Sequence, residues 1–95
     1  MRLFVTPSAE ADLQGILDYI AAERPQTAKQ VVDRIRDKCE LIRRHPEIGQ
    51  RRPEFAGNYR SWPVDRWVIF YRVASDSVEV HRVIDGSRDI DSLLD

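Results

Sequence analysis

The sequence predicts an α+β fold in one domain, residues 1–95, in which two helices precede an antiparallel sheet. Apolar residues recur at helical spacing twice in the first half of the chain, and three short apolar runs separated by turns fill the second half. Short connections force neighbouring strands to pair antiparallel. The expected order is therefore an N-terminal strand, an antiparallel helical hairpin and a three-stranded meander (β-α-α-β-β-β), with the hairpin packed on one face of the sheet.

The N-terminal segment predicts a brief strand followed by a helix. Residues 3–5 are Leu-Phe-Val, a short apolar run. Thr6 is suited to cap the first orphan amide groups of a helix, and Pro7 fits its first position. An apolar stripe at spacings of three and four residues follows. Pro25 disfavours helical geometry in the residue before it, so we expect the first helix to end near Arg24.

A second apolar stripe predicts a second helix. It runs from Ala28 to Ile42, and charged residues surround the opposite side. The pair His45-Pro46 ends it, and His45 has its favourable place at a helix C-terminus. Because the joint at Pro25 is so short, the two helices are expected to lie antiparallel, side by side.

A loop and three strands are predicted for the rest of the chain. Residues 46–58 hold two prolines and two glycines without periodicity, and Ile48 and Phe55 are expected to pin this loop to the core. Pro63 lacks an amide hydrogen, so its strand lies at an edge or carries a bulge. The second strand is apolar on both faces, so it is central or one face meets a partner. The three strands are expected at about 59–64, 67–73 and 78–84.

The charges are unevenly distributed although the net charge is only −1. Counting Lys and Arg against Asp and Glu, the balance is −2 over residues 1–33, +5 over residues 34–72 and −4 over residues 73–95. A protein that coats nucleic acid is usually basic over its whole domain. The basic middle therefore favours a local contact with something anionic.

Cysteine usage and hydropathy predict a cytoplasmic protein without cofactors. Cys39 is the only cysteine, so no internal disulfide can form, and its neighbours place it on the buried side of the second helix. No apolar run approaches the ~18 residues of a membrane span, and the N-terminus lacks the pattern of a signal peptide. His45 and His81 are far apart in sequence, so no metal site is expected.

Several motifs follow one another in a characteristic order. The chain resembles the ParE/RelE superfamily of bacterial type II toxins, specifically its ParE branch, over essentially its whole length. The residues that carry the resemblance are Tyr19-Ile20, Pro46 and Gly49, Arg51-Arg52-Pro53-Glu54, Gly57 with Arg60, Ile69-Phe70-Tyr71-Arg72-Val73, and Arg82-Val83-Ile84-Asp85-Gly86-Ser87-Arg88-Asp89.

The resemblance implies a toxin that is held inactive by a cognate antitoxin. That antitoxin is a ribbon-helix-helix (ParD-like) protein whose C-terminal segment wraps the toxin, so any contact with operator DNA is indirect. The ParE branch poisons DNA gyrase, whereas the RelE branch cleaves messenger RNA in the ribosomal A site. One fold serves both functions, so only the site can decide between them.

The residues favour a binding protein over a ribonuclease. A metal-free ribonuclease needs a base, a cationic clamp and an acid on one patch. In a comparison with the RelE pattern, Arg60 and Arg88 match two of the required positions. Aligned on the shared tyrosine, however, the other positions are taken by Val68, Trp62 and Leu94. We therefore expect no catalytic residue and inhibition by binding.

His81 and the arginine loop leave a catalytic alternative open. His81 could serve as an acid or a base, although a lone histidine in a strand is more often structural. Glu54 with Arg51 or Arg52 could form a catalytic loop, although a solvated loop is commoner. The readings in falling order are a gyrase-poisoning toxin, a ribosome-dependent messenger RNA endonuclease, and a degenerate member that only binds its antitoxin.

Two sets of candidate contacts follow from the resemblance and the pattern. Arginine and tryptophan are over-represented in interface hot spots, so the candidates for target binding are Arg60, Trp62, Arg66, Arg82, Arg88 and Asp89. Arg88 and Asp89 have the alternative role of a local ion pair. The antitoxin is expected on the apolar side of the helices, where the candidates are Leu13, Leu17, Tyr19, Ile20 and Val32.

Overall fold

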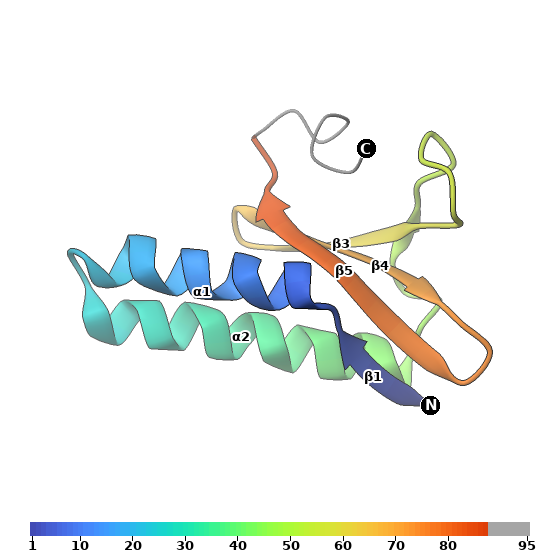
Figure 1. Cartoon of the computed structure of the whole chain (residues 1–95), viewed down its shortest axis with the longest axis horizontal. Helices are drawn as coiled ribbons and strands as arrows, with labels where there is room; N and C mark the ends of the chain where they lie inside the picture. Colours follow the sequence, from blue (N-terminus) through green and yellow to red (C-terminus); the bar gives the residue numbers. More distant parts are fainter. Residues whose placement is uncertain (88–95) are drawn as a thin grey trace.

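The helical hairpin covers one face of a single sheet (Figure 1). The computed structural model describes residues 1–87. Two antiparallel helices lie side by side, and both pack against the sheet, which confirms the predicted α+β fold. The elements are β1 (Arg2–Val5), α1 (Pro7–Ala21), α2 (Pro25–Arg44), β2 (Gln50–Arg51), β3 (Arg60–Val64), β4 (Trp67–Val73) and β5 (Ser77–Asp85).

The sheet has five strands in the order β1-β5-β4-β3-β2. β3, β4 and β5 form the predicted antiparallel meander, and β1 pairs parallel with β5. β4 is central, as expected for a strand that is apolar on both faces. β2 was not predicted: it has two residues and pairs only with Arg60 and Ser61. The outer edge of β3 is therefore left without a strand partner at Pro63, which has no amide hydrogen to donate.

The first helix begins where the sequence predicted and ends earlier. Thr6 is extended and its Oγ1 accepts a hydrogen bond from the Ala9 amide at 3.1 Å, while Pro7 occupies the first turn. α1 ends at Ala21, three residues before Arg24. The reason is that Pro25 opens α2, so Arg24 takes the non-helical conformation that precedes a proline.

The main core lies between the hairpin and the sheet. Cys39 is 2% exposed, and burial raises the pKa of its thiol to about 12, so it stays protonated and acts as a small apolar residue. Within residues 1–87 no helix combines the length and apolar character needed to cross a membrane. The buried core residues from the two layers are Ala9, Leu13, Ile16, Val32, Ile35, Cys39, Ile42, Val64, Ile69, Tyr71, Val78, Val80 and Val83.

The opposite face of the sheet is partly covered by the loop between β2 and β3. Phe70 of β4 is fully buried there, and the ring of Phe55 meets it edge-on at 6.0 Å between centroids. The guanidinium of Arg52 lies over both rings, at 5.2 and 5.3 Å from their centroids. Ile48 packs against the main core. The predicted anchoring of the loop by Ile48 and Phe55 is thus confirmed.

A buried hydroxyl group fixes the turn that leaves α2. Tyr71 is fully buried, and its hydroxyl donates to the Pro46 carbonyl oxygen at 2.7 Å while accepting from the Gly49 amide at 2.8 Å. Burial raises the pKa of Tyr71, which keeps the hydroxyl able to donate. Nη1 of Arg60 donates to the carbonyl oxygens of Glu47 and Gly49 at 3.1 and 2.9 Å. These hydrogen bonds connect the buried Tyr71, the turn after α2 and the Arg60 side chain.

Gly49 is required by this close approach. A Cβ atom there would lie 2.4 Å from the Tyr71 hydroxyl oxygen, whereas a Cβ at Gly15 in α1 would meet nothing within 4 Å. We expect Gly49→Ala to lower the free energy of unfolding by about 1–3 kcal/mol through overpacking. Gly15→Ala is the matched control and should raise it by about 0.5–1 kcal/mol, because alanine favours a helix interior. Urea denaturation measures both, and equal stability of Gly49→Ala and wild type would contradict the assignment.

Candidate binding surface

The residues predicted for target binding do not share one surface. Arg60 begins β3 and Arg66 lies in the turn after it, so the whole strand, roughly 17 Å at 3.4 Å per residue, separates them. Trp62 lies between them but is half-buried and packs against the core on the helix side. Arg88 and Asp89 lie outside the described residues.

Arg82 connects the sheet to α1. Its Nε and Nη2 atoms donate to the Asp12 carboxylate at 2.8 and 3.0 Å. Asp12 also accepts from the Val83 amide at 2.9 Å. β1 ends at Val5, which pairs with Val80. In the described part of the chain no strand lies beside this edge of β5 after Val80, so the Val83 amide finds its acceptor in Asp12 instead. Arg82, predicted as a target contact, is therefore engaged within the fold through Asp12.

Arg66 is exposed and paired with the end of β5. Its guanidinium forms an ion pair with Asp85 and lies 5.0 Å from the centroid of the Trp67 ring. The backbone amide of Ser87, then Arg66 and the Ser87 hydroxyl, lower the pKa of Asp85 to about 2. Exposed pairs of this kind contribute little to stability, but Arg66 does not present an unpaired charge.

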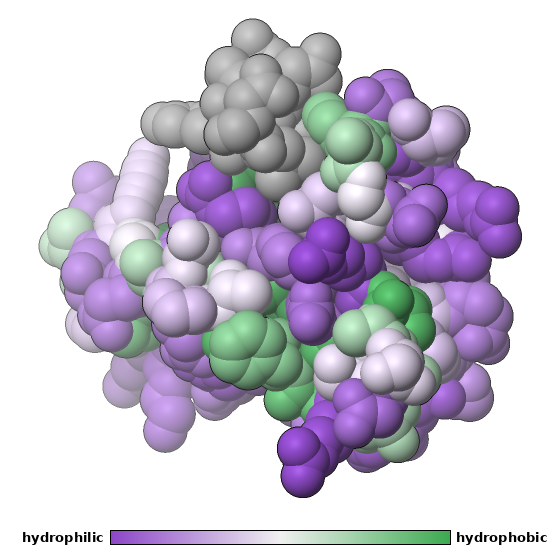
Figure 2. All heavy atoms as spheres, turned by 45° about the vertical axis from the view of Figure 1, so that its right-hand side comes forward, coloured by the Kyte–Doolittle hydropathy of each residue, from purple (hydrophilic) through white to green (hydrophobic). Residues whose placement is uncertain are grey.

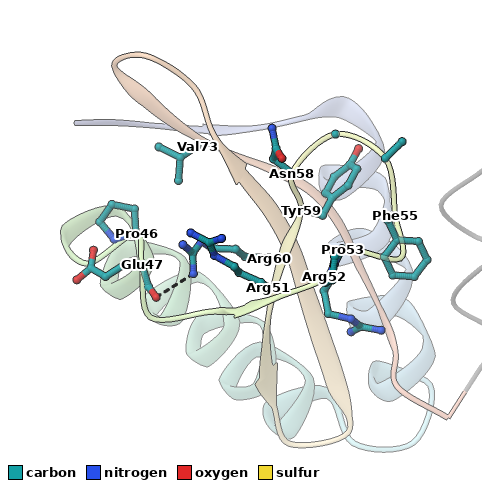
Figure 3. A pocket seen from close by; sticks show the side chains of 12 residues that line it. Pro46, Glu47, Arg51, Arg52, Pro53, Phe55, Asn58, Tyr59, Arg60 and Val73 are labelled. Atoms are coloured by element: carbon teal, nitrogen blue, oxygen red, sulfur yellow. Dashed lines mark hydrogen bonds between the residues drawn. The ribbon is translucent and has the colours of Figure 1, made fainter.

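Arg51 and Arg60 form a pair of like charges on neighbouring strands. They are directly opposite in the antiparallel β2–β3 ladder, so their side chains leave the same face. Figure 3 shows them next to each other, with Arg60 bonded to the Glu47 carbonyl oxygen and the Glu47 carboxylate turned away. Within residues 1–87 neither guanidinium has a carboxylate partner. The pair is the uncompensated positive charge of this surface.

The pair borders a hollow of about 690 Å³ beside the start of β3. Pro46 and Glu47 form one side, and the loop that carries Asn58 forms another. Asn58 has a φ of 59°, which turns the chain into β3. Val73, 43% exposed, adds an apolar wall. We call this feature the arginine hollow. On the face shown in Figure 2, hydrophilic side chains dominate and apolar atoms emerge in small groups.

His81 belongs to a chain of hydrogen bonds on the face opposite the helices. Its Nδ1 lies 3.2 Å from the Tyr59 hydroxyl and its Nε2 lies 3.1 Å from Oε1 of Glu79. Nε of Arg72 donates to the same Glu79 oxygen at 3.0 Å. The hydrogen bond from His81, and next the one from Arg72, lower the pKa of the Glu79 carboxyl group. Both ring nitrogens of the histidine are thus engaged within the protein.

The acid–base candidate and the arginine pair lie on different faces of the sheet. Side chains alternate between faces along a strand, so Arg60 shares the side of Trp62 and Tyr71. His81 lies at a bulge of β5, and its contact with Glu79, which alternates with the core residues Val78 and Val80, places it on the other side. In the described part of the chain no three His, Cys, Asp or Glu side chains are grouped to hold a metal. The arrangement suits binding of an anion better than proton transfer.

The candidates for antitoxin binding differ sharply in exposure. Leu13 and Val32 are only 2% and 9% exposed because they fill the core between the hairpin and the sheet, so they are out of a partner's reach. Leu17 and Ile20 are half-buried against that core. Tyr19 of α1 is 64% exposed. The expected contact is therefore centred on Tyr19.

Comparison with known proteins decides the family. A family model for the ParE toxin of type II toxin-antitoxin systems, parDE, matches residues 3–90. The chain belongs to the ParE toxin family. Among solved structures, a chain of the chromosomal ParDE toxin-antitoxin system from P. aeruginosa matches with a TM-score of 0.79 and 22% identity, over 90% of this chain and 95% of that one. At 22% identity, this similarity shows that the two chains share a fold. A search of curated proteins gave no match.

The structure explains several motif residues of this ParE-family toxin. Pro46, Gly49, Arg60 and Tyr71 meet in the network that fixes the turn after α2. Arg51, the partner of Arg60 in the arginine hollow, belongs to the motif Arg51-Arg52-Pro53-Glu54 and to a possible catalytic loop, but the sequence does not predict it as a target contact. Its role depends on the pairing of β2 with β3, and a two-residue strand gives no periodic signal.

The Asp12–Arg82 contact gives a testable difference in stability. Asp12→Ala removes the carboxylate to which the Arg82 guanidinium and the Val83 amide donate, so we expect a loss of about 2 kcal/mol in the free energy of unfolding. Glu10→Ala is the control on the same helix, because Glu10 also accepts two bonds from an arginine, Arg36, but is exposed. It should cost at most about 1 kcal/mol. Equal losses in urea denaturation would contradict the special role of Asp12.

Proposed function

We propose that this ParE-family toxin inhibits DNA gyrase by binding it, without catalysis, and that a cognate ribbon-helix-helix antitoxin neutralises it in the cytoplasm. The observation that carries the proposal is the arginine hollow, where neither Arg51 nor Arg60 is paired with a carboxylate of residues 1–87. Such a surface suits attachment to an anionic group on another molecule.

The distribution of polar groups supports binding over cleavage. Cutting RNA without a metal requires a base, an acid and a cationic clamp around one phosphate. Val68 and Trp62 occupy two positions that the RelE pattern fills with basic groups, and both are half-buried. Tyr59 lines the arginine hollow, but its partner His81 is held by Glu79 on the face of the sheet opposite Arg60. Among residues 1–87 the groups for acid–base cleavage are therefore not brought together around one point.

The antitoxin is proposed to contact α1 at Tyr19. Tyr19 is a large side chain with most of its surface in solvent, whereas Leu17 and Ile20 are half-buried against the core. An amphipathic segment commonly binds across such a helix surface, and exposed aromatic residues serve as anchors. Contact with operator DNA would be made by the antitoxin and only indirectly by the toxin.

Gyrase inhibition is tested with the purified toxin. We expect it to block the supercoiling of relaxed plasmid and to trap cleaved plasmid. We expect Arg51→Gln to weaken this inhibition about tenfold or more, which corresponds to the loss of binding free energy usual for a hot-spot residue. Arg24→Gln is the control, since Arg24 is exposed at the start of α2, far from the hollow. Undiminished supercoiling at high toxin concentration would sink the proposal.

The alternative is a ribosome-dependent messenger RNA endonuclease of the RelE type. The contact of His81 with Tyr59 and Glu79 is the observation in its favour, because a carboxylate can orient an imidazole for proton transfer. Cleavage of ribosome-bound messenger RNA that is abolished by His81→Ala would establish it. Growth arrest accompanied by a DNA-damage response, without such cleavage, would support gyrase.

Tyr19→Asp should separate antitoxin binding from folding. Tyr19 is 64% exposed, so its replacement should change the free energy of unfolding by less than about 0.5 kcal/mol. We expect the affinity for the cognate antitoxin to fall about tenfold or more, because a charge replaces an aromatic anchor. Ser75→Asp, in the exposed turn before β5, adds the same charge as a control. Calorimetric titration measures both, and unchanged affinity in Tyr19→Asp would place the antitoxin elsewhere.

A further inference from the structure

The position of Arg51 opposite Arg60 is unfavourable for the protein alone. Like charges directly opposite on antiparallel strands repel each other, and these two face one another in the β2–β3 ladder. In the β4–β5 ladder, by contrast, Arg72 lies opposite the acidic residue Glu79 and donates a hydrogen bond to it. An uncompensated pair at the rim of a hollow is the arrangement expected where an anion from another molecule binds between the two guanidiniums.

Arg60 is held in place before any ligand arrives. Its Nη1 is fixed by the carbonyl oxygens of Glu47 and Gly49, and Gly49 is in turn held by the buried Tyr71 hydroxyl. The other nitrogens of that guanidinium have no protein acceptor among the described residues. A preorganised guanidinium loses little conformational freedom on binding, which favours affinity.

The surroundings of the pair favour a carboxylate over a phosphate backbone. A nucleic acid strand needs a track of several cations, usually on a basic domain. Here the chain has a net charge of −1, and Glu47 lines the same hollow as Arg51 and Arg60. A third arginine of the hollow, Arg52, is paired with Glu54. Pro46 and the exposed Val73 add apolar walls. This combination matches one carboxylate flanked by apolar side chains.

We infer that the arginine hollow binds a carboxylate side chain of an acidic polypeptide segment on the protein that the toxin attacks. The carboxylate lies between Arg51 and Arg60, and apolar residues next to it in the segment contact Pro46 and Val73. The inference rests on the proposed function as a binding toxin and adds the chemistry of the contact.

The test uses a fluorescein-labelled peptide of glutamate, glycine and valine, and a single-stranded oligonucleotide with the same label. Fluorescence anisotropy with the full-length toxin should show binding of the peptide in preference to the oligonucleotide. Arg51→Gln should weaken peptide binding about tenfold or more, the size expected for a hydrogen-bonded charge pair. Arg24→Gln removes the same charge at a remote exposed position and should leave it unchanged. Thermal unfolding confirms that both exposed variants fold.

Three results would overturn the inference: no peptide binding, tighter binding of the oligonucleotide, or equal losses in Arg51→Gln and Arg24→Gln. The gyrase assay separates this from a failure of the proposed function. A peptide that binds through Arg51, with no gyrase inhibition, refutes the function and leaves the site. Gyrase inhibition that is equally strong in wild type and Arg51→Gln keeps the function and refutes the site.

Discussion

The hydroxyl of Tyr71 is the contact on which the rest of the surface depends. Its ring fills the core beneath the helices, while its oxygen joins Pro46 and Gly49 across the turn after α2. β2 begins at the next residue, Gln50. The buried hydroxyl therefore sets where β2 pairs with β3, and hence which side chain lies opposite Arg60. An unpaired hydroxyl in this position would cost about 1–3 kcal/mol, which explains why turn, strand and core form one unit.

Local pattern was sufficient for most of the fold. Helical spacing gave both helices, and turn residues separated the strands of the meander. α1 ends three residues before the predicted Arg24, because Pro25 is the first residue of α2 and the two helices need a short joint between them. β2 could not be predicted, since two exposed residues carry no periodicity. The parallel pairing of β1 with β5 depends on the whole chain and has no local signal.

The candidate site was harder to predict because it is made by contacts between distant residues. Alternation along β3 already implied that Arg60 and Trp62 share a side, but the partner of Arg82 lies 70 positions away in α1. That pairing holds within the fold an arginine that the sequence predicts at the target surface. Conversely, Arg51 gains its importance only from its position opposite Arg60. Charge and composition predict a contact with an anion, whereas bringing Arg51 and Arg60 together needed the register of the sheet.

Native-state hydrogen exchange at the Gly49 amide tests the central role of the Tyr71 hydroxyl most directly. The account predicts that this amide exchanges slowly in the wild type, with an opening free energy close to that of global unfolding, because its acceptor is buried. In Tyr71→Phe it should exchange about tenfold faster or more relative to the amide of Ile69 in central β4. A Gly49 amide that exchanges in the wild type as fast as an exposed loop amide would contradict the account.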